Sequence, residues 1–316
     1  MFPIIDAIPK SALDADLAQL PESARILTHK DYEVWLAPAI KIPSILQEIG
    51  RLREISFRAA GEGTGQAIDL DNFDAYYQHL FIWHKQRHAV IGAYRLGFSG
   101  DIIAEHGLEG FYTYQLFDYT PAFIEQLQPC IELGRSFVRV EDQRSFVPLL
   151  LLWRGISTTA YLNPSYRRLF GPVSISADIP PLFRQLLAET LLKLHGEPEL
   201  AAQIKARNPL PASHFSPDML AGLANATELE SVLQANMPDI RIPVLLRQYL
   251  NLNGRLLSFS LDPNFNNTLD GLVLVDLDRV EPHTLSRYMG TQAAHDFLYG
   301  AENHHADVDT GKPRAA

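Results

Sequence analysis

Strand-like and helix-like patterns of apolar residues alternate along nearly the whole chain, and this interleaving constrains the fold more than any other feature of the sequence. Residues 43–58 and 181–195 carry apolar side chains at helical spacing, and each segment begins with a proline. Residues 79–83 and 89–96 have the pattern of two consecutive strands joined by a polar turn. A second pair of consecutive strands is expected near residue 260. The order predicts an α/β (mixed α+β) fold with a central mixed sheet flanked by helices, and not a doubly wound one.

The remaining elements and the boundaries follow from the same patterns. Residues 146–162 are nearly apolar all round, which predicts a buried helix. Residues 1–28 are expected to form an N-terminal extension, residues 29–300 one domain, and the polar residues 301–316 a disordered tail. The other expected strands are 32–38, 111–117, 131–138, 169–176, 256–261 and 272–277, and the other expected helices are 121–128, 244–252 and 283–299.

Charge and composition exclude several classes of protein. The chain has 27 basic and 37 acidic residues (27 − 37 = −10), which argues against a nucleic-acid partner. The single Cys130 excludes an internal disulfide and any Cys-rich metal site. The longest apolar run, Val147 to Trp153, is far shorter than the roughly 20 residues of a membrane span, and Met1 to Lys10 lacks a signal-peptide pattern. We therefore expect a cytoplasmic globular protein.

Familiar catalytic motifs are missing from the sequence. The histidines form no H-E-x-x-H pair, so no metal site is expected, and no G-x-S-x-G elbow is present. Gly61 to Gly65 follow a helix and not a strand, which predicts a flexible loop and not a nucleotide-binding loop. The H-x-x-x-x-D spacing from His304 to Asp309 lies in the polar tail and is attributed to chance.

Two charged residues, Glu132 and Arg135, lie inside an otherwise apolar strand. A two-residue period would place Glu132, Gly134 and Ser136 on one face of that strand, and Leu133, Arg135 and Phe137 on the other. A buried charge is costly unless it is paired or serves a site. The pattern allows either an ion-pair network that holds the sheet to its helices, or a catalytic site.

Several segments together resemble one enzyme family. They are Glu132-Leu-Gly-Arg-Ser-Phe-Val138, Arg53 with Phe57, residues 71–80, and Val90-Ile-Gly-Ala-Tyr-Arg-Leu96. With further matches up to about Gly300, the chain resembles the GNAT-fold amino-acid N-acyltransferases of ornithine-lipid synthesis. This family is often labelled "putative hemolysin" and is distantly similar to acyl-homoserine-lactone synthases. The resemblance implies a GNAT-like acyl-CoA N-acyltransferase fold.

The same resemblance implies an activity. It is the transfer of a long-chain (3-hydroxy)fatty acyl group, from acyl carrier protein or CoA, to the α-amine of an amino acid such as ornithine or glycine. The product would be a lyso-aminolipid. Two alternatives stay open: an acyl-homoserine-lactone-type signal synthase, and a non-catalytic acyl-carrier or lipid-binding module.

This chemistry suggests roles for the charged residues. Glu132 is the first candidate for the general base, with Asp71 or Asp74 as the alternative. A strand bulge near Glu132 to Ser136 would offer backbone N–H groups to the oxyanion. The expected substrate-binding residues are Arg53, His79, Arg95, Arg135 and Ser136, and the expected acyl-tunnel residues are Phe57, Phe137, Leu152, Trp153 and Phe170.

The donor is expected to be acyl carrier protein, with no cofactor bound permanently. Ordinary acetyl-CoA members of the resembled fold bind the CoA pyrophosphate at a Gly-containing turn and helix start. The matching residues 143–149 contain no glycine, and Pro148 lacks an N–H. An acidic carrier would need a basic patch, for which Arg139, Arg144, Arg154, Arg167 and Arg168 are the candidates. An amphiphilic product would also suit peripheral contact with the inner membrane.

Overall fold

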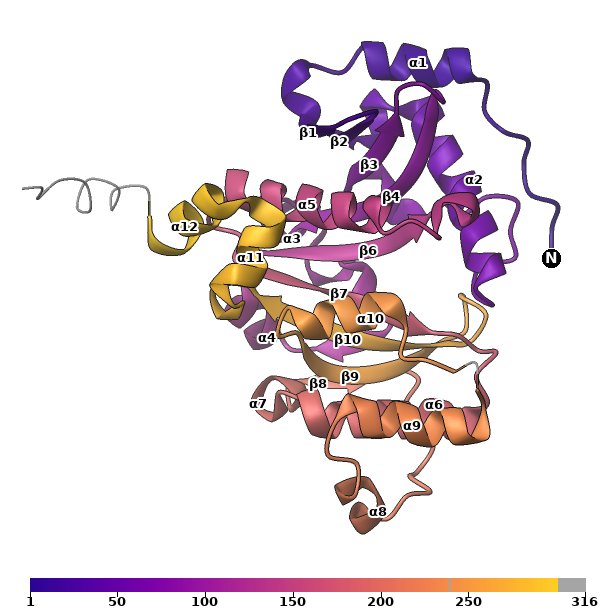
Figure 1. The fold of residues 1–316 in the computed structure, drawn as a ribbon, viewed down its shortest axis with the longest axis vertical. Helices are drawn as coiled ribbons and strands as arrows, with labels where there is room; N and C mark the ends of the chain where they lie inside the picture. Colours follow the sequence, from indigo (N-terminus) through magenta and orange to yellow (C-terminus); the bar gives the residue numbers. More distant parts are fainter. Residues whose placement is uncertain (239, 301–316) are drawn as a thin grey trace, which may run out of the picture.

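One large mixed sheet organises the molecule in the computed structural model, which describes residues 1–238 and 240–300 (Figure 1). The predicted tail and the His304 to Asp309 spacing lie outside the described residues. The strand order is β1-β2-β3-β4-β6-β7-β10-β9, and every neighbouring pair is antiparallel except β6 and β7. The predicted central mixed sheet flanked by helices is confirmed.

The bounds of the elements are as follows. The large sheet consists of β1 Arg25–His29, β2 Tyr32–Pro38, β3 Gln78–His84, β4 Ala89–Phe98, β6 Cys130–Val138, β7 Arg168–Ile175, β9 Arg255–Asp262 and β10 Thr268–Asp276, and a second sheet pairs β5 Phe117–Tyr119 with β8 Ile204–Ala206. The helices are α1 Lys10–Ala18, α2 Pro43–Ala59, α3 Ser99–His106, α4 Pro121–Leu127, α5 Val147–Leu162, α6 Pro181–His195, α7 Pro198–Ala201, α8 Pro217–Ala221, α9 Ala226–Asn236, α10 Val244–Asn251, α11 Pro282–Met289 and α12 Thr291–Tyr299.

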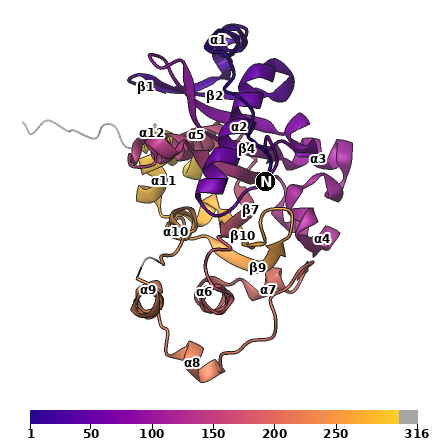
Figure 2. The ribbon, with the colours of Figure 1, turned by 90° about the vertical axis from the view of Figure 1, so that its right-hand side faces the viewer.

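Helices cover both faces of the sheet. Ile45, Ile49 and Leu52 of α2 pack against Trp35 and Phe81 on one face. On the other face α5 packs closely on β2 and β3. Gly155 of α5 allows this approach, since an added Cβ there would lie 2.9 Å from Val34 and 3.0 Å from Leu80. Helices α6 and α9 lie side by side beyond β9 (Figure 2). In the part of the chain that the structure describes, no helix is both long and apolar enough to cross a bilayer.

The N-terminal residues contribute to this sheet. The Asp16 carboxylate accepts the backbone N–H groups of Ser44 and Ile45 at 2.6 and 2.9 Å, so α1 caps the start of α2. Residues Arg25–His29 pair with β2 as an edge strand. The predicted domain boundary at residue 28 therefore falls inside β1.

The predicted strand at 111–117 is wrong. Residues Leu108–Gly110 and Tyr112–Gln115 form short 3₁₀ helices, and only Phe117–Tyr119 is a strand. The aromatic composition favours a strand, but the backbone N–H groups of Tyr112 and Thr113 donate to the side chain of Glu132 instead of to a neighbouring strand.

The strands β6 and β7 separate part-way along their length. They pair only through Cys130, Ile131 and Glu132 with residues 168–170. At the point of separation the two backbones approach closely, because a Cβ at Gly171 would lie 2.0 Å from the carbonyl oxygen of Leu133. Because no described residue of β6 after Glu132 pairs with β7, a gap opens in the middle of the sheet beyond this residue.

Candidate functional site

A β-bulge in β6 lies beside this gap. Ala93 of β4 pairs with Phe137, but Arg95 pairs with Gly134, so β6 contains one extra residue between these pairs. Arg135 has a φ of +50°, the left-handed conformation that such a bulge requires. The predicted bulge between Glu132 and Ser136 is thus confirmed.

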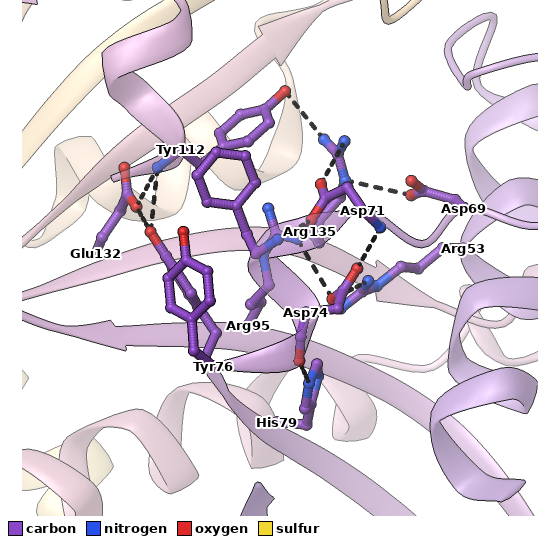
Figure 3. A network of polar contacts seen from close by, with 12 residues as sticks. Arg53, Asp69, Asp71, Asp74, Tyr76, His79, Arg95, Tyr112, Glu132 and Arg135 are labelled. Atoms are coloured by element: carbon purple, nitrogen blue, oxygen red, sulfur yellow. Dashed lines mark hydrogen bonds and ion pairs between the residues drawn. The ribbon is translucent and has the colours of Figure 1, made fainter. Parts of the chain in front are cut away.

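The bulge changes which side chains lie together. Glu132 accepts the backbone N–H of Tyr112 at 2.9 Å, and Arg135 donates to the Tyr112 hydroxyl at 3.1 Å (Figure 3). The prediction that Glu132 and Arg135 point to opposite faces is therefore wrong. The regular two-residue alternation fails because the extra residue reverses it.

Five of the predicted residues form one buried ionic network (Figure 3). Arg53 lies 2.7 Å from Asp74, and Arg95 lies 2.5 Å from Asp71 and 3.3 Å from Asp74. Arg135 lies 3.4 Å from Asp71 and 3.3 Å from Asp69, a residue to which the sequence assigned no role. Each acid has a cationic partner, so burial of these charges is compensated.

A local turn holds the two central acids in place. The Asp71 side chain accepts the N–H of Phe73, and the Asp74 side chain accepts the N–H of Asp71, both at 2.9 Å. Burial raises the pKa of Asp74, but the charges of Arg53 and Arg95 more than offset this, and the pKa lies well below its usual range. Asp74 is consequently a poor proton acceptor, which contradicts its predicted role as a base.

His79 is also part of the buried network. Its Nε2 atom lies 2.9 Å from the carbonyl oxygen of Asp74. Burial, with the nearby charge of Arg53, lowers the pKa of His79 to about 4, so the ring is neutral at pH 7. His79 does not line either of the two cavities described below, and its position supports the turn that carries Asp74.

Glu132 is sealed from the cavities. It is 1% exposed, and it accepts hydrogen bonds from the N–H of Thr113 at 2.7 Å, from the N–H of Tyr112 and from the Tyr77 hydroxyl. Burial raises the pKa of Glu132. Because Glu132 lines neither cavity, its position does not support the predicted role of a base and fits that of a support for residues 110–113.

A cavity of about 340 Å³ occupies the gap between β6 and β7. It is lined by Phe57 from α2 on one face of the sheet, and by Leu149 from α5 and Tyr249 from α10 on the other. We call it the gap cavity. Its walls also include residues 133–138 of β6 and 172–174 of β7, so it passes through the sheet.

The structure divides the predicted tunnel residues. Phe57 and Phe137 line the gap cavity, as do the predicted binding residues Arg135 and Ser136. Leu152, Trp153 and Phe170 line neither described cavity, which corrects their assignment. Leu152 and Trp153 belong to the core beneath α5, and the ring of Phe170 packs 5.5 Å from that of Phe111.

A second cavity of about 350 Å³ is adjacent and more polar. Asp69, Asp71 and Asp262 line it, with amide side chains from Gln115 and Asn208. We call it the acidic cavity. Arg135 and Tyr112 line both cavities and form their common wall.

Two carboxylates in the gap cavity, Asp270 and Glu62, were not selected from the sequence. Burial raises the pKa of Asp270 to about 7, although a hydrogen bond from Ser174 opposes the shift. Burial, together with the negative charge of Asp270, raises the pKa of Glu62 to about 8, and Arg135 opposes this. Asp270 lies in β10 and is, like Glu132, an acid inside a largely apolar strand, but the predicted strand begins at residue 272 and leaves Asp270 out.

The glycine-rich loop holds Glu62 at the cavity and is not simply flexible. The N–H of Glu62 donates to the Phe57 carbonyl at 2.8 Å, which ends α2. The buried Glu54 carboxylate accepts the hydroxyl of Thr64 at 2.7 Å and the N–H of Gly65 at 2.8 Å. These bonds correct the prediction of a flexible loop.

The predicted carrier-binding arginines do not form one patch. Arg139 and Arg144 follow the C-terminal end of β6, whereas Arg168 pairs with Cys130 at the opposite end of that strand. Arg167 and Arg168 also have acidic partners, Asp278 at 2.8 Å and Asp276 at 3.6 Å. Among residues 1–238 and 240–300, no group of three His, Cys, Asp or Glu side chains is arranged to hold a metal ion.

Comparison with known proteins agrees with this architecture. Residues 52–154 match the acetyltransferase (GNAT) domain family. A glycine N(alpha)-acyltransferase of Phocaeicola vulgatus is 28% identical over 283 residues, which cover 84% of this chain and 85% of that protein. A glycine N(alpha)-acyltransferase of Bacteroides thetaiotaomicron is 27% identical over 309 residues, covering 92% and 90%.

Two solved structures show a weaker likeness. The acyl-homoserine-lactone synthase LasI aligns with a TM-score of 0.33 and 14% identity, over 45% of this chain and 72% of its own. The CoA-dependent acyl-homoserine lactone synthase MesI aligns with a TM-score of 0.38 and 12% identity, over 81% and 95%. The matched domain and the relatives in sequence identify the chain as an acyltransferase that carries a GNAT domain and is homologous to glycine N(alpha)-acyltransferases.

Proposed function

We propose that the enzyme transfers a long-chain acyl group, 3-hydroxylated or plain, from a thioester on acyl carrier protein to the α-amine of an amino acid. Glycine is the first acceptor to consider, because two homologous proteins are named for it, and ornithine is the second. One observation carries the proposal: an apolar and an acidic cavity meet at Arg135 and Tyr112, beside the bulge of β6. A two-substrate transfer needs such a meeting point.

The gap cavity suits the acyl thioester. Phe57, Phe137, Leu149 and Leu245 supply apolar wall for a fatty chain. Beyond Glu132, the edge of β6 that faces β7 has no strand partner among the described residues. Backbone N–H groups there are available as donors to the oxyanion of the tetrahedral intermediate.

The acidic cavity suits the amino acid. Asp69, Asp71 and Asp262 attract an ammonium group, and Arg135 is the cation within reach of a carboxylate. Arg53 and Arg95 are buried against Asp71 and Asp74 and contribute by fixing these acids. In this scheme they are positioning residues.

The start of α5 favours a carrier protein over free CoA. Pro148 has no N–H, and the N–H of Val147 already donates to the Ser145 hydroxyl at 3.2 Å. Few backbone donors therefore remain there for a pyrophosphate. Arg144 is exposed next to Gln143, a lining residue of the gap cavity, and is the candidate contact for the acidic carrier.

A direct assay tests the proposal. Purified protein is incubated with 3-hydroxypalmitoyl acyl carrier protein and glycine or ornithine, and free carrier thiol and N-acylated product are measured by a thiol reagent and mass spectrometry. We expect product only when both substrates are present, and faster transfer from the carrier than from CoA. Absence of product with every acceptor would refute the proposal, and a lactone formed from S-adenosylmethionine would replace it by the signal-synthase alternative.

A further inference from the structure

Asp270 and Glu62 come from distant parts of the chain and line the same cavity. Asp270 is 2% exposed on β10, where it pairs with Ser174 of β7. Glu62 follows α2 on the other side of the gap. We propose that Asp270 is the general base of the transfer and that Glu62 is its partner in carrying protons to solvent. This assignment rests on the proposed function.

The other acids near the site are already committed. Asp74 and Asp71 form ion pairs with Arg53, Arg95 and Arg135, and Glu132 is sealed behind Tyr112. In the described part of the chain, neither Asp270 nor Glu62 has a cation within ion-pair distance. Asp270 has hydroxyl neighbours in Ser174 and in Thr268, the latter at 3.5 Å, and no ionic partner among the described residues, so carboxylate lone pairs remain available to a substrate.

A second observation indicates that the gap cavity is built for a polar group of a ligand. The Tyr94 hydroxyl lines this cavity and is buried, with Tyr94 1% exposed. Its polar neighbours are the hydroxyl groups of Ser136 and Tyr249, which line the same cavity. This buried group of three hydroxyls can exchange a hydrogen bond with a bound thioester or acyl hydroxyl.

The proton balance of the reaction gives both acids a task. The acceptor arrives as an ammonium with three N–H protons. One proton passes to Asp270, and the nitrogen then attacks the thioester carbon, which forms the C–N bond of a tetrahedral intermediate. This intermediate collapses as the C–S bond breaks. One proton stays on the amide, one ends on the carrier thiol, and one is released to solvent. Glu62 lines the cavity and is half-buried, so it can pass this last proton to solvent.

The charges around Asp270 make it a usable base at neutral pH. Asp262 of β9 and Glu62 add negative charge, Arg135 of β6 adds positive charge, and Ser174 of β7 donates a hydrogen bond. The balance leaves the pKa of Asp270 at about 7, close to the pH at which a base works best. The pKa of Asp270 therefore agrees with the role of base, which is assigned from the position of Asp270 in the gap cavity.

The test compares four proteins by their pH–rate profiles: wild type, Asp270→Asn, Glu62→Gln and Glu105→Gln. The last removes a carboxylate from α3 that is 72% exposed and lies outside both cavities. For Asp270→Asn we expect kcat to fall by roughly 100-fold or more, with the donor KM within about threefold of wild type. The acid limb of the profile near pH 7 should disappear, and Asp270→Glu should recover part of the rate.

The outcomes separate this inference from the function on which it rests. Glu62→Gln should lower kcat by about tenfold, and Glu105→Gln should leave the profile unchanged. If wild type transfers acyl groups and Asp270→Asn does so equally well with the same acid limb, Asp270 is not the base but the proposed function stands. If folded wild type transfers nothing, the proposed function is wrong and the base assignment with it.

Discussion

The Arg135 guanidinium donates a hydrogen bond to the Tyr112 hydroxyl over 3.1 Å, and these two side chains form the wall between the gap cavity and the acidic cavity. The guanidinium carbon also lies 4.7 Å from the centre of the Tyr112 ring. The Tyr112 hydroxyl donates in turn to Asp262 at 2.9 Å. The two cavities that we assign to the acyl donor and the amine are therefore separated by one tyrosine and one arginine.

Replacing Tyr112 by phenylalanine removes this hydroxyl and keeps the ring. Arg135 then loses an acceptor and Asp262 loses a donor, and each such bond to a charged group contributes about 1.5–3 kcal/mol. We expect kcat/KM for the amino acid to fall by at least about tenfold, with the donor KM unchanged. Steady-state kinetics test this, and Tyr161→Phe, outside both cavities, is the matched control.

Glu132→Gln should act on folding and geometry and not on proton transfer. The amide offers one acceptor oxygen where the carboxylate accepts the N–H groups of Tyr112 and Thr113 and the Tyr77 hydroxyl. We expect urea unfolding to show a loss of about 1–3 kcal/mol and kcat to fall, with the acid limb of the pH profile in its original place. A displaced acid limb would return the role of base to Glu132.

Leu149→Trp should change the chain length that the enzyme prefers. Leu149 lines the gap cavity from α5, and a larger side chain would occupy space that a long acyl chain needs. We expect kcat/KM for a palmitoyl-length donor to fall by about tenfold or more, while that for a butanoyl donor stays near wild type. Leu162→Trp is the control, because Leu162 is an exposed residue at the end of the same helix. An equal loss for both donors would exclude this cavity as the acyl site.

The buried carboxyl of Asp270 should make stability depend on pH. Its pKa is about 7 in the folded protein and about 4 in an unfolded chain. Between these values the folded protein keeps a proton that the unfolded chain releases. The contribution of Asp270 to the free energy of unfolding is therefore full below about pH 4 and declines by about 1 kcal/mol per pH unit as the pH rises to 7.

Urea unfolding of wild type and Asp270→Asn at pH 5, 6, 7 and 8 measures this dependence. The variant cannot lose that proton, so its stability relative to wild type should increase from pH 5 to pH 7 and then level off. A constant difference between the two proteins would show that Asp270 titrates with an ordinary pKa.

Patterns within one element were enough to predict much of the fold. The helical spacing of residues 43–58 corresponds to α2, and the apolar segments 79–83 and 89–96 with the polar turn between them correspond to the observed hairpin of β3 and β4. The structure of residues 111–117 could not be predicted in this way. The N–H groups of Tyr112 and Thr113 donate to the carboxylate of Glu132, about 20 residues further along the chain. Long-range side-chain contacts of this kind leave no periodic signal.

The site was predictable in part. Charge inside an apolar strand singled out Glu132 and Arg135, and the family resemblance pointed to Arg53, Asp71, Asp74 and Arg95. These last four residues form one network with Arg135. The orientation of Glu132 and the exposure of Asp270 and Glu62 to the cavity depend on the bulge and on the separation of β6 from β7. Both features are properties of strand pairing, which a single strand does not reveal.

The gap cavity between β6 and β7 lies across the border of the matched domain. Residues 52–154 contribute one side, with β6 and the first half of α5, while β7, α10 and β10 contribute the other. A fragment ending at residue 154 would consequently retain the bulge but leave it open to water. Chimeras that exchange the C-terminal half between relatives would replace the second wall, with Asp270, and leave the first wall, with Glu62, unaltered.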